Sequence, residues 1–296
     1  MAVKKQVAIL EAAISCGSPT RGTEFAYDAL MDGGLAEVFP GCAAVPMEKL
    51  TPCRQYPPHL KHLDTVMTVN RRLRAKVLSA LEQGQFPLVI GGDHSIAMGS
   101  LAALGEFYGA EELAVVYIDA HADINTEATS QSACIHGMDL AAACGLCCDE
   151  LTVGKNRVNL LGENLHIIGG RSIDDPEWSI MEQQGVHLYS AEEIQACGLD
   201  HVLERVISRV KGKRVHISFD VDSLDPSEFR ATGYLIPGGL TFAQVRRIIK
   251  EVTDTGSLVS FECVEYNPTV DQDGTDRKKL MELFRFLRDC MEKNNI

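Results

Sequence analysis

The stretch "VVYIDAHADIN", residues 115–125, begins as an apolar strand and ends in side chains that can bind metal. Its first four residues are β-branched or aromatic, which is typical of a buried strand. Asp119, His121 and Asp123 then follow at intervals of two. Because alternate residues of an extended chain point the same way, these three side chains can converge on one point.

Other short, β-rich apolar runs occur along the chain, and segments with helical spacing lie between them. The runs are "VAILEAA", "FPLVIGG", "LAVVYIDA", "LHIIGG", "VHLYS", "VHISFDVD" and "LVSFECVEYN". Residues 60–84, 200–210, 241–252 and 276–294 have the apolar spacing of amphipathic helices, with Asp200 and Thr241 as expected N-caps. This alternation predicts an α/β fold with a mainly parallel sheet and helices on both faces.

The organisation of the chain favours one domain over residues 1–296. A chain of 296 residues with 45% hydrophobic content can bury a substantial core. We find no low-complexity linker, charge block or repeat of fixed period. Long loops are expected at residues 17–59 and 125–136.

The net charge of -13, with 41 acidic against 28 basic residues, makes the surface repel phosphate backbones and anionic lipid. We therefore expect no nucleic-acid partner and no membrane partner. The apolar N-terminal stretch is interrupted by Glu11, and no other run approaches transmembrane length. Neither a signal peptide nor a spanning helix is expected, which predicts a cytoplasmic protein.

Ten cysteines are present, and Cys144, Cys147 and Cys148 form a cluster that contains a CxxC motif. No second pair stands at the spacing of a zinc site. We expect reduced, partly buried thiols rather than disulfides or a metal site.

Ionisable residues also end three other predicted strands. "VIGGDHS" contributes Asp93 and His94, "ISFDVDSLDP" contributes Asp220, Asp222 and Asp225, and "FECVEYN" contributes Glu262 and Glu265. Carboxylates this crowded would raise one another's pKa unless cations compensated their charge. His94, His121 and the aspartates 119, 123, 220 and 222 are too many ligands for one zinc. They suit two oxygen-preferring ions with bridging carboxylates, manganese before iron, cobalt or zinc.

Each motif alone also has a structural interpretation. "DxHxD" could be a polar loop, "DVD" is common where a strand enters a turn, and "GGDHS" could be a glycine turn into a helix capped at Ser95. Only their joint occurrence at strand ends favours metal. We expect His166, His187 and His216, near the starts of strands or inside them, to be packed histidines, and assign no chemistry to His59, His62 and His201.

Four segments, "GGDHS", "DAHADINT", "SFDVDSLDP" and "VEYNP", resemble the signature segments of the ureohydrolases, and within them the arginases, in order and spacing. The likeness runs from "CGSPTRGTE", residues 16–24, to about residue 270. It implies the three-layer arginase-deacetylase fold and a homo-oligomer, either a trimer or a hexamer.

The resemblance also implies a centre of two Mn²⁺ ions per chain. His94, Asp119, Asp123 and Asp220 would hold one ion, and His121, Asp119, Asp220 and Asp222 the other. A metal-bridging hydroxide would attack the guanidinium carbon of L-arginine, giving urea and L-ornithine. Asp123 would accept its hydrogen bond, His136 would shuttle the proton to the leaving amine, and Glu265 would receive the guanidinium.

Recognition of the substrate's other end separates the possible activities. By resemblance, Asn125, Ser130 and Ser132 bind the α-carboxylate, Asp174 lies near the α-amino group, and Glu177 lies close by. This set favours arginine over agmatine, which lacks the carboxylate. Tyr234 and Leu235 depart from the family pattern, which has Thr followed by Pro beside the substrate. An agmatinase, another guanidino-substrate hydrolase and a non-catalytic metal-binding relative remain alternatives.

Overall fold

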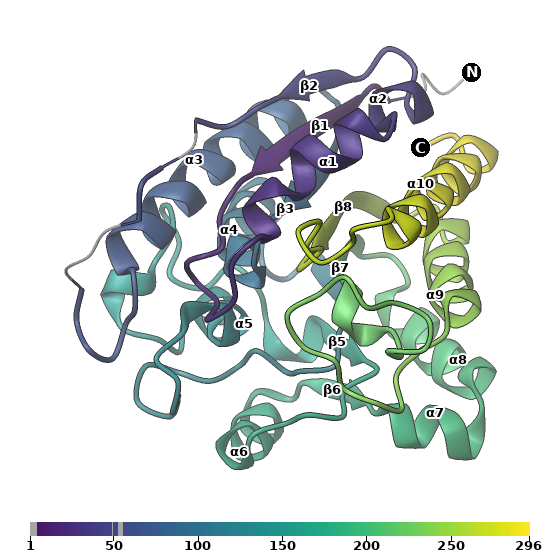
Figure 1. Ribbon diagram of the computed structural model, residues 1–296. Coiled ribbons are helices and arrows are strands. Elements are labelled where there is room, and N and C mark those ends of the chain that lie inside the picture. The colour runs from purple at the N-terminus through teal and green to yellow at the C-terminus, as the bar shows by residue number, and fades with distance from the viewer. Residues whose placement is uncertain (1–4, 49, 53–55) are drawn as a thin grey trace.

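A computed structural model describes residues 5–48, 50–52 and 56–296, and its centre is one parallel sheet (Figure 1). The eight strands found in these residues run in the order β2-β1-β3-β8-β7-β4-β5-β6. They are β1 Val7–Ala12, β2 Ala43–Val45, β3 Phe86–Gly91, β4 Leu113–Ile118, β5 Leu165–Ile168, β6 His187–Tyr189, β7 Arg214–Asp220 and β8 Leu258–Val264. Every pairing is parallel.

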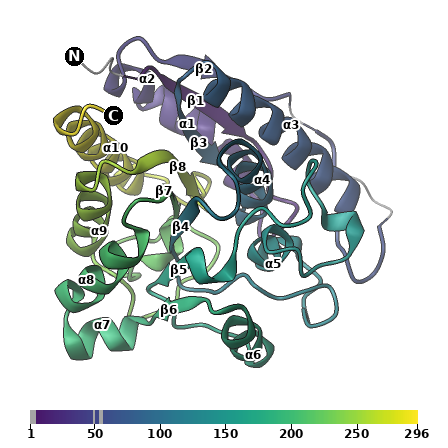
Figure 2. The same cartoon turned by 180° about the vertical axis from the view of Figure 1, so that it is seen from behind.

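Helices cover both faces of the sheet. They are α1 Ala26–Asp32, α2 Leu35–Val38, α3 Leu63–Glu82, α4 Ala97–Tyr108, α5 Asp139–Ala143, α6 Asp175–Gln184, α7 Ala191–Cys197, α8 Leu199–Val210, α9 Phe242–Asp254 and α10 Thr275–Lys293. Helices α3, α4 and α5 pack on one face, and α1, α2, α8, α9 and α10 on the other (Figure 1 and Figure 2). This arrangement confirms the predicted three-layer fold. None of the helices in the described part of the chain is long and apolar enough to cross a bilayer.

The two faces of the sheet support two hydrophobic cores, which explains the nearly unbroken apolar strands. In β1, Val7 and Ile9 join one core, while Ala8 and Leu10 join the other. A strand buried on both faces needs apolar residues at odd and even positions. Each fully buried aliphatic side chain contributes about 1.5–3 kcal/mol relative to an exposed one.

Several predictions about local structure were wrong. The expected loop at 17–59 contains α1, α2 and β2, because Tyr27, Leu30 and Leu35 bury against the core. Helix α8 is capped by Gly198 rather than Asp200. The turn at "GGDHS" is capped by Asp93, whose carboxylate accepts from the Ser95 amide, rather than by Ser95.

Other local predictions are confirmed. Thr241 caps α9, where its hydroxyl accepts from the Gln244 amide and Gln244 accepts from the Thr241 amide. Residues 125–134 carry no helix or strand, and a single 3₁₀ turn, Ile135–Gly137, closes that loop.

Strand register brings the ionisable residues to one edge of the sheet. Ile118 of β4 lies opposite Phe219 of β7, and Asp220 of β7 lies opposite Val264 of β8. The next residues, Asp119 and Glu265, therefore leave the sheet on either side of Asp220. The carboxyl edge of a parallel sheet is where α/β proteins bind ligands.

Candidate metal centre and substrate pocket

Two overlapping groups of His and Asp side chains lie at the carboxyl ends of β4 and β7 and just after β3. One is His94, Asp119 and Asp220, and the other is Asp119, His121 and Asp222. Within each group, one candidate ligand atom per residue lies within 4.8 Å of the others. Asp119 belongs to both groups, so its carboxylate links them.

The two oxygens of Asp119 face different histidines. Oδ2 is 2.9 Å from Nδ1 of His94, and Oδ1 is 3.4 Å from Nδ1 of His121. Asp220 Oδ2 lies 3.1 Å from His94 Nδ1, and Asp222 Oδ2 lies 3.2 Å from His121 Nδ1. This is the disposition that a bridging carboxylate between two cations requires.

His94 is oriented from behind by a buried polar chain. Its Nε2 lies 2.8 Å from the Ser218 hydroxyl, which donates to Glu262 Oε1 at 2.7 Å. Because that hydroxyl hydrogen is already donated, Nε2–H donates to Ser218, and Nδ1 carries the lone pair that faces Asp119 and Asp220. The sequence did not single out Ser218, although its position two residues before Asp220 places it on the same face of β7.

Unpaired buried atoms fit a cation at this position. Among the described residues, His94 Nδ1 and Asp119 Oδ2 are buried without a hydrogen-bond partner. Burial, followed by the charges of Asp222 and Asp119, raises the pKa of Asp220 well above its usual range. Burial and the charge of Asp119 raise the pKa of Asp123 to about 7. Divalent cations would relieve both the missing contacts and the carboxylate repulsion.

Asp123 lies beside the cluster rather than in either group. Its Oδ2 is 3.4 Å from His94 Nδ1 and accepts a hydrogen bond from the Tyr117 hydroxyl at 2.9 Å. Its φ of 46° is in the left-handed region, which costs a non-glycine residue about 1–3 kcal/mol. The Leu140 amide donates to the Asp123 carbonyl at 3.1 Å and helps to hold this conformation.

Glu265 and His136 contact each other next to the cluster. Glu265 Oε1 accepts from the His94 amide at 2.9 Å and lies 3.4 Å from His136 Nδ1. Its Oε2 is buried with no partner in the described residues, and its φ is 61°. Burial would lower the pKa of His136, but the hydrogen bond to Glu265 and nearby carboxylates raise it above the usual value.

A polar pocket of about 230 Å³ opens beside His121, Asp123 and His136. It contains all the remaining predicted substrate residues except Glu265, namely Asn125, Ser130, Ser132, Asp174 and Glu177. The structure adds Gly137, Ser172, Tyr234 and Ile236 to this lining. The structure thus brings the predicted substrate residues other than Glu265 around one cavity. Glu265 is not in the lining and lies 3.4 Å from His136 Nδ1.

Contacts inside the pocket distinguish Asp174 from Glu177. Asn125 Nδ2 donates to Asp174 Oδ2 at 2.9 Å. Glu177 Oε1 accepts from the Ile124 amide at 3.0 Å, and Oε2 accepts from the Asp174 amide at 2.8 Å as part of the α6 capping box. Both Glu177 oxygens therefore support the backbone of the pocket, and burial raises the pKa of this carboxyl.

Tyr234 turns into the pocket, while Leu235 is 42% exposed. The phenol ring meets the His121 ring edge-on at 5.4 Å between centroids and stacks with the His136 ring at 6.0 Å. It is thus an aromatic wall between His121 and His136, at the position where the arginase pattern has a small hydroxyl residue.

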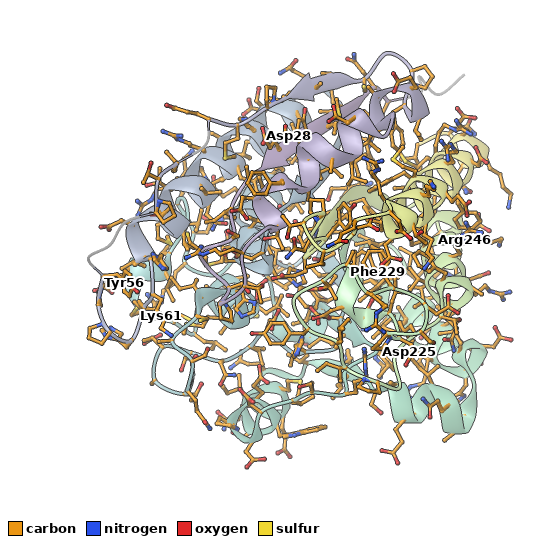
Figure 3. All side chains as sticks on the ribbon, viewed as in Figure 1. Asp28, Tyr56, Lys61, Asp225, Phe229 and Arg246 are labelled. Atoms are coloured by element: carbon orange, nitrogen blue, oxygen red, sulfur yellow. The ribbon has the colours of Figure 1, made fainter. Side chains whose placement is uncertain are left out.

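The loop that carries Tyr234 is fixed at several points. Arg171 donates to the Ile236 carbonyl at 2.8 Å and to the Asp222 carbonyl at 2.8 Å. Asp225, labelled in Figure 3 beside the buried Phe229, accepts from the Gly238 amide at 2.8 Å. The backbone that follows Tyr234 is therefore anchored to Arg171 and Asp225.

The cysteine cluster follows α5, and its residues are not part of the pocket lining or of the two His–Asp groups. Cys144 and Cys147 are buried, and neither is in a disulfide. Burial raises the pKa of Cys144 to about 12, which disfavours the reactive thiolate. Cys53, the tenth cysteine, lies outside the described residues.

The fold and the site together define an α/β protein with two overlapping histidine–aspartate groups, which are candidate metal ligands, beside a polar pocket. A sequence model of the Arginase family matches residues 5–284, and the chain belongs to this family. The resemblance seen in the four signature segments is therefore confirmed.

Individual relatives agree with this assignment. The chain is 33% identical to an arginase of Bacillus caldovelox over 279 residues, covering 90% of this chain and 93% of the relative. It is 37% identical to an arginase of Bacillus subtilis over 236 residues, 77% of each chain. The solved structure of the Bacillus caldovelox arginase superposes with a TM-score of 0.90 at 32% identity, covering 96% of this chain and 98% of that one.

Proposed function

We propose that this member of the Arginase family is a hydrolase that converts L-arginine to L-ornithine and urea with two Mn²⁺ ions per chain. One observation carries the proposal: the Asp119 carboxylate faces His94 with one oxygen and His121 with the other. That arrangement borders a pocket whose amide, hydroxyl and carboxylate groups suit an amino acid. Relatives that match most of the chain are named arginases.

The donor set suits two manganese ions. His94, Asp119, Asp123 and Asp220 would hold one, and His121, Asp119, Asp220 and Asp222 the other. When bound, such ions lower the pKa of water so that hydroxide is available near neutral pH. The oxygen-rich set favours Mn²⁺ over softer metals.

The pocket residues would bind and orient the substrate. Asn125, Ser130 and Ser132 offer neutral donors to the α-carboxylate. Asp174 would accept from the α-amino group, and Glu177 would hold Asp174 in place through its backbone amide. The unpaired Oε2 of Glu265 is a buried acceptor for the guanidinium, a charge-assisted pairing.

His136 would move the proton that the leaving amine needs. Glu265 raises its pKa relative to an equally buried free imidazole, so its protonated form persists toward neutral pH. Asp123, beside His94 and in the pocket wall, would accept the hydrogen bond of the attacking nucleophile. These roles for His136, Asp123 and Glu265 follow from the likeness to arginases together with their contacts.

The proposal extends to the chain's context. We propose a single domain over residues 1–296 that assembles as a cytoplasmic trimer or hexamer, as family likeness implies. The charge of -13 argues against nucleic-acid and anionic-membrane partners.

A substrate panel tests the activity. The metal-free chain is reconstituted with Mn²⁺, and urea release is measured with L-arginine, agmatine and 4-guanidinobutyrate. We expect L-arginine to give by far the highest kcat/KM. Equal or faster turnover of agmatine would assign the chain to another amidinohydrolase, and no urea from any substrate despite bound Mn²⁺ would support a non-catalytic metal binder. His201→Ala, at an exposed site on α8, serves as the control variant.

A further inference from the structure

A buried phenol and a buried carboxyl lie directly behind Asp123. Tyr117 in β4 and Asp139 at the start of α5 are both 0% exposed. The Tyr117 Oη lies 2.9 Å from Asp123 Oδ2 and 3.1 Å from Asp139 Oδ2. The Tyr117 ring also stacks on His94, with centroids 4.4 Å apart and an interplanar angle of 5°. One side chain thus touches two residues of the proposed metal centre.

The number of hydrogens limits how these three groups can interact. A phenol has one hydrogen, so it can donate to only one of the two carboxyl groups that flank it. If Tyr117 donates to Asp123, the phenol oxygen faces Asp139 with a lone pair. Two acceptors at 3.1 Å would repel, unless the Asp139 carboxyl carries a proton and donates it to that lone pair.

The surroundings of Asp139 favour its neutral form. Its Oδ1 is buried with no hydrogen-bond partner among the residues that the structure describes. An ionised carboxylate would therefore lose its hydration without full compensation. Burial, together with the charges of Asp123 and Asp119, raises the pKa of Asp139 well above its usual range against the opposing charge of His94.

Backbone hydrogen bonds also link the start of α5 to the segment that contains Asp123. The Leu140 amide, next to Asp139, donates to the Asp123 carbonyl at 3.1 Å, and the Asn125 amide donates to the Gly137 carbonyl at 3.1 Å. The start of α5 is therefore docked along residues 123–125. Because Asp123 has a strained φ of 46° and lies beside other carboxylates, its side chain needs donors to stay in place.

We propose that Tyr117 and Asp139 form a positioning pair for Asp123. Hydrogen bonds run from the neutral Asp139 carboxyl to Tyr117 and from Tyr117 to Asp123 Oδ2, and they hold that carboxylate beside His94, where Oδ2 lies 3.4 Å from Nδ1. The inference rests on the proposed role of Asp123 at the metal centre. Removing a residue that hydrogen-bonds to a metal ligand commonly lowers metal affinity or activity by about 10–100-fold.

Three substitutions test the pair. Tyr117→Phe keeps the ring on His94 but removes the hydroxyl. Asp139→Asn retains a neutral group whose NH₂ can donate to the phenol oxygen, whereas Asp139→Leu has a similar volume and no donor. Mn²⁺ stoichiometry and dissociation constants are measured by calorimetry, alongside kcat for urea release and the melting temperature of the metal-free chain.

We expect Tyr117→Phe and Asp139→Leu to weaken binding of the more weakly held Mn²⁺ about 10–100-fold and to lower kcat similarly. Asp139→Asn should stay within about threefold of the unsubstituted chain, because it preserves the direction of the hydrogen bonds. Wild-type Mn²⁺ affinity and kcat in Tyr117→Phe would overturn the proposal. So would equal losses in Asp139→Asn and Asp139→Leu.

Two features of the experiment separate failure of the positioning pair from failure of the variant to fold and from failure of the proposed activity. If Tyr117→Phe does not fold, the comparison of Asp139→Asn with Asp139→Leu carries the same test. Metal affinity is measured without substrate, so a chain that releases no urea but loses Mn²⁺ affinity in Tyr117→Phe would refute arginase activity and support the positioning pair.

Discussion

Two of the buried histidines in and beside the sheet, His94 and His166, differ in what surrounds the imidazole. At the carboxyl ends of β4 and β7, His94 and His121 face four aspartates. Further along the sheet, His166 of β5 stacks on His187 of β6, with ring centroids 5.0 Å apart, and the Arg209 guanidinium donates to His187 at 3.2 Å. The sequence distinguishes the two places by the aspartates beside His94 and His121 and by position, since His166 and His187 lie near the starts of their strands.

The two surroundings shift the pKa of the buried imidazoles in opposite directions. Burial disfavours the charged form of His94, but the Asp119 and Asp220 carboxylates, 2.9 and 3.1 Å from its Nδ1, raise its pKa well above the usual value. Burial, then His187 and Arg209, lower the pKa of His166 to about 3. Burial alone therefore does not make a site. The candidate metal centre differs from the stacked histidines in the carboxylates that converge with its imidazoles.

The largest expected effect comes from removing the charge shared by both groups. Asp119→Asn should abolish binding of at least one Mn²⁺ and lower urea production from L-arginine about 10³-fold or more, the scale of several kcal/mol of charge stabilisation. Metal analysis and steady-state kinetics check this, with His201→Ala as the control. Full metal content with unchanged kcat would remove Asp119 from the centre.

Next in size is the effect of the hydroxyls that we propose to bind the α-carboxylate. Ser132→Ala should raise KM for L-arginine about 10-fold, which corresponds to one hydrogen bond to a charged group. Turnover of agmatine should change little, since agmatine has no carboxylate to lose. KM for L-arginine and KM for agmatine are measured on one preparation of each variant. A parallel rise for both substrates would mean that Ser132 acts on the pocket as a whole.

The Tyr234 wall should control the length of the accepted substrate. Tyr234→Thr removes the ring beside His121 and His136, so we expect kcat/KM for L-homoarginine relative to L-arginine to rise about 10-fold, the scale of one methylene. Tyr234→Phe keeps the ring and should stay within about twofold. A competition assay with both amino acids measures the ratio. An unchanged ratio in Tyr234→Thr would show that the ring does not limit the substrate.

The smallest effect on activity is expected at the stacked pair of His166 and His187. His166 has a folded pKa of about 3, so between pH 6.5 and 3 the unfolded chain binds a proton that the folded chain does not, and stability falls with falling pH. His166→Leu removes this contribution. Its free energy of unfolding relative to the unsubstituted chain should rise by about 2 kcal/mol from pH 8 to pH 5.

Chemical denaturation at the two pH values measures that shift, and Mn²⁺ content and kcat at pH 8 should not change. A constant difference between the two chains would mean that His166 titrates as in the unfolded state. Loss of bound Mn²⁺ would mean that the stacked pair and the metal centre are coupled.

Patterns along single strands predicted which ionisable residues gather at this edge of the sheet. In β4, the apolar residues before Asp119 identify the strand and its exit, but the strand ends at Ile118 and the left-handed φ of Asp123 breaks the expected alternation. The arrangement of elements distant in sequence was not predictable in the same way. Tyr117 and Asp139 are 22 residues apart and meet only because α5 docks beside β4.

The inward turn of Tyr234 depends on the anchors of its loop, and those also lie in other segments. Asp93, rather than Ser95, caps its turn because the carboxylate also accepts from the Gly17 amide at 2.8 Å, a contact across 76 residues. The sequence did not predict short elements such as β2, because three residues are too few to show a periodic pattern.

We propose that the two linked His–Asp groups hold two cations for hydrolysis of a guanidinium. The most direct test titrates the metal-free chain with Mn²⁺ and records bound ions and urea release from L-arginine on the same samples. We predict that urea release rises with occupancy and reaches its maximum at two Mn²⁺ per chain. Maximal activity at one ion or none, or two bound ions without urea release, would contradict it.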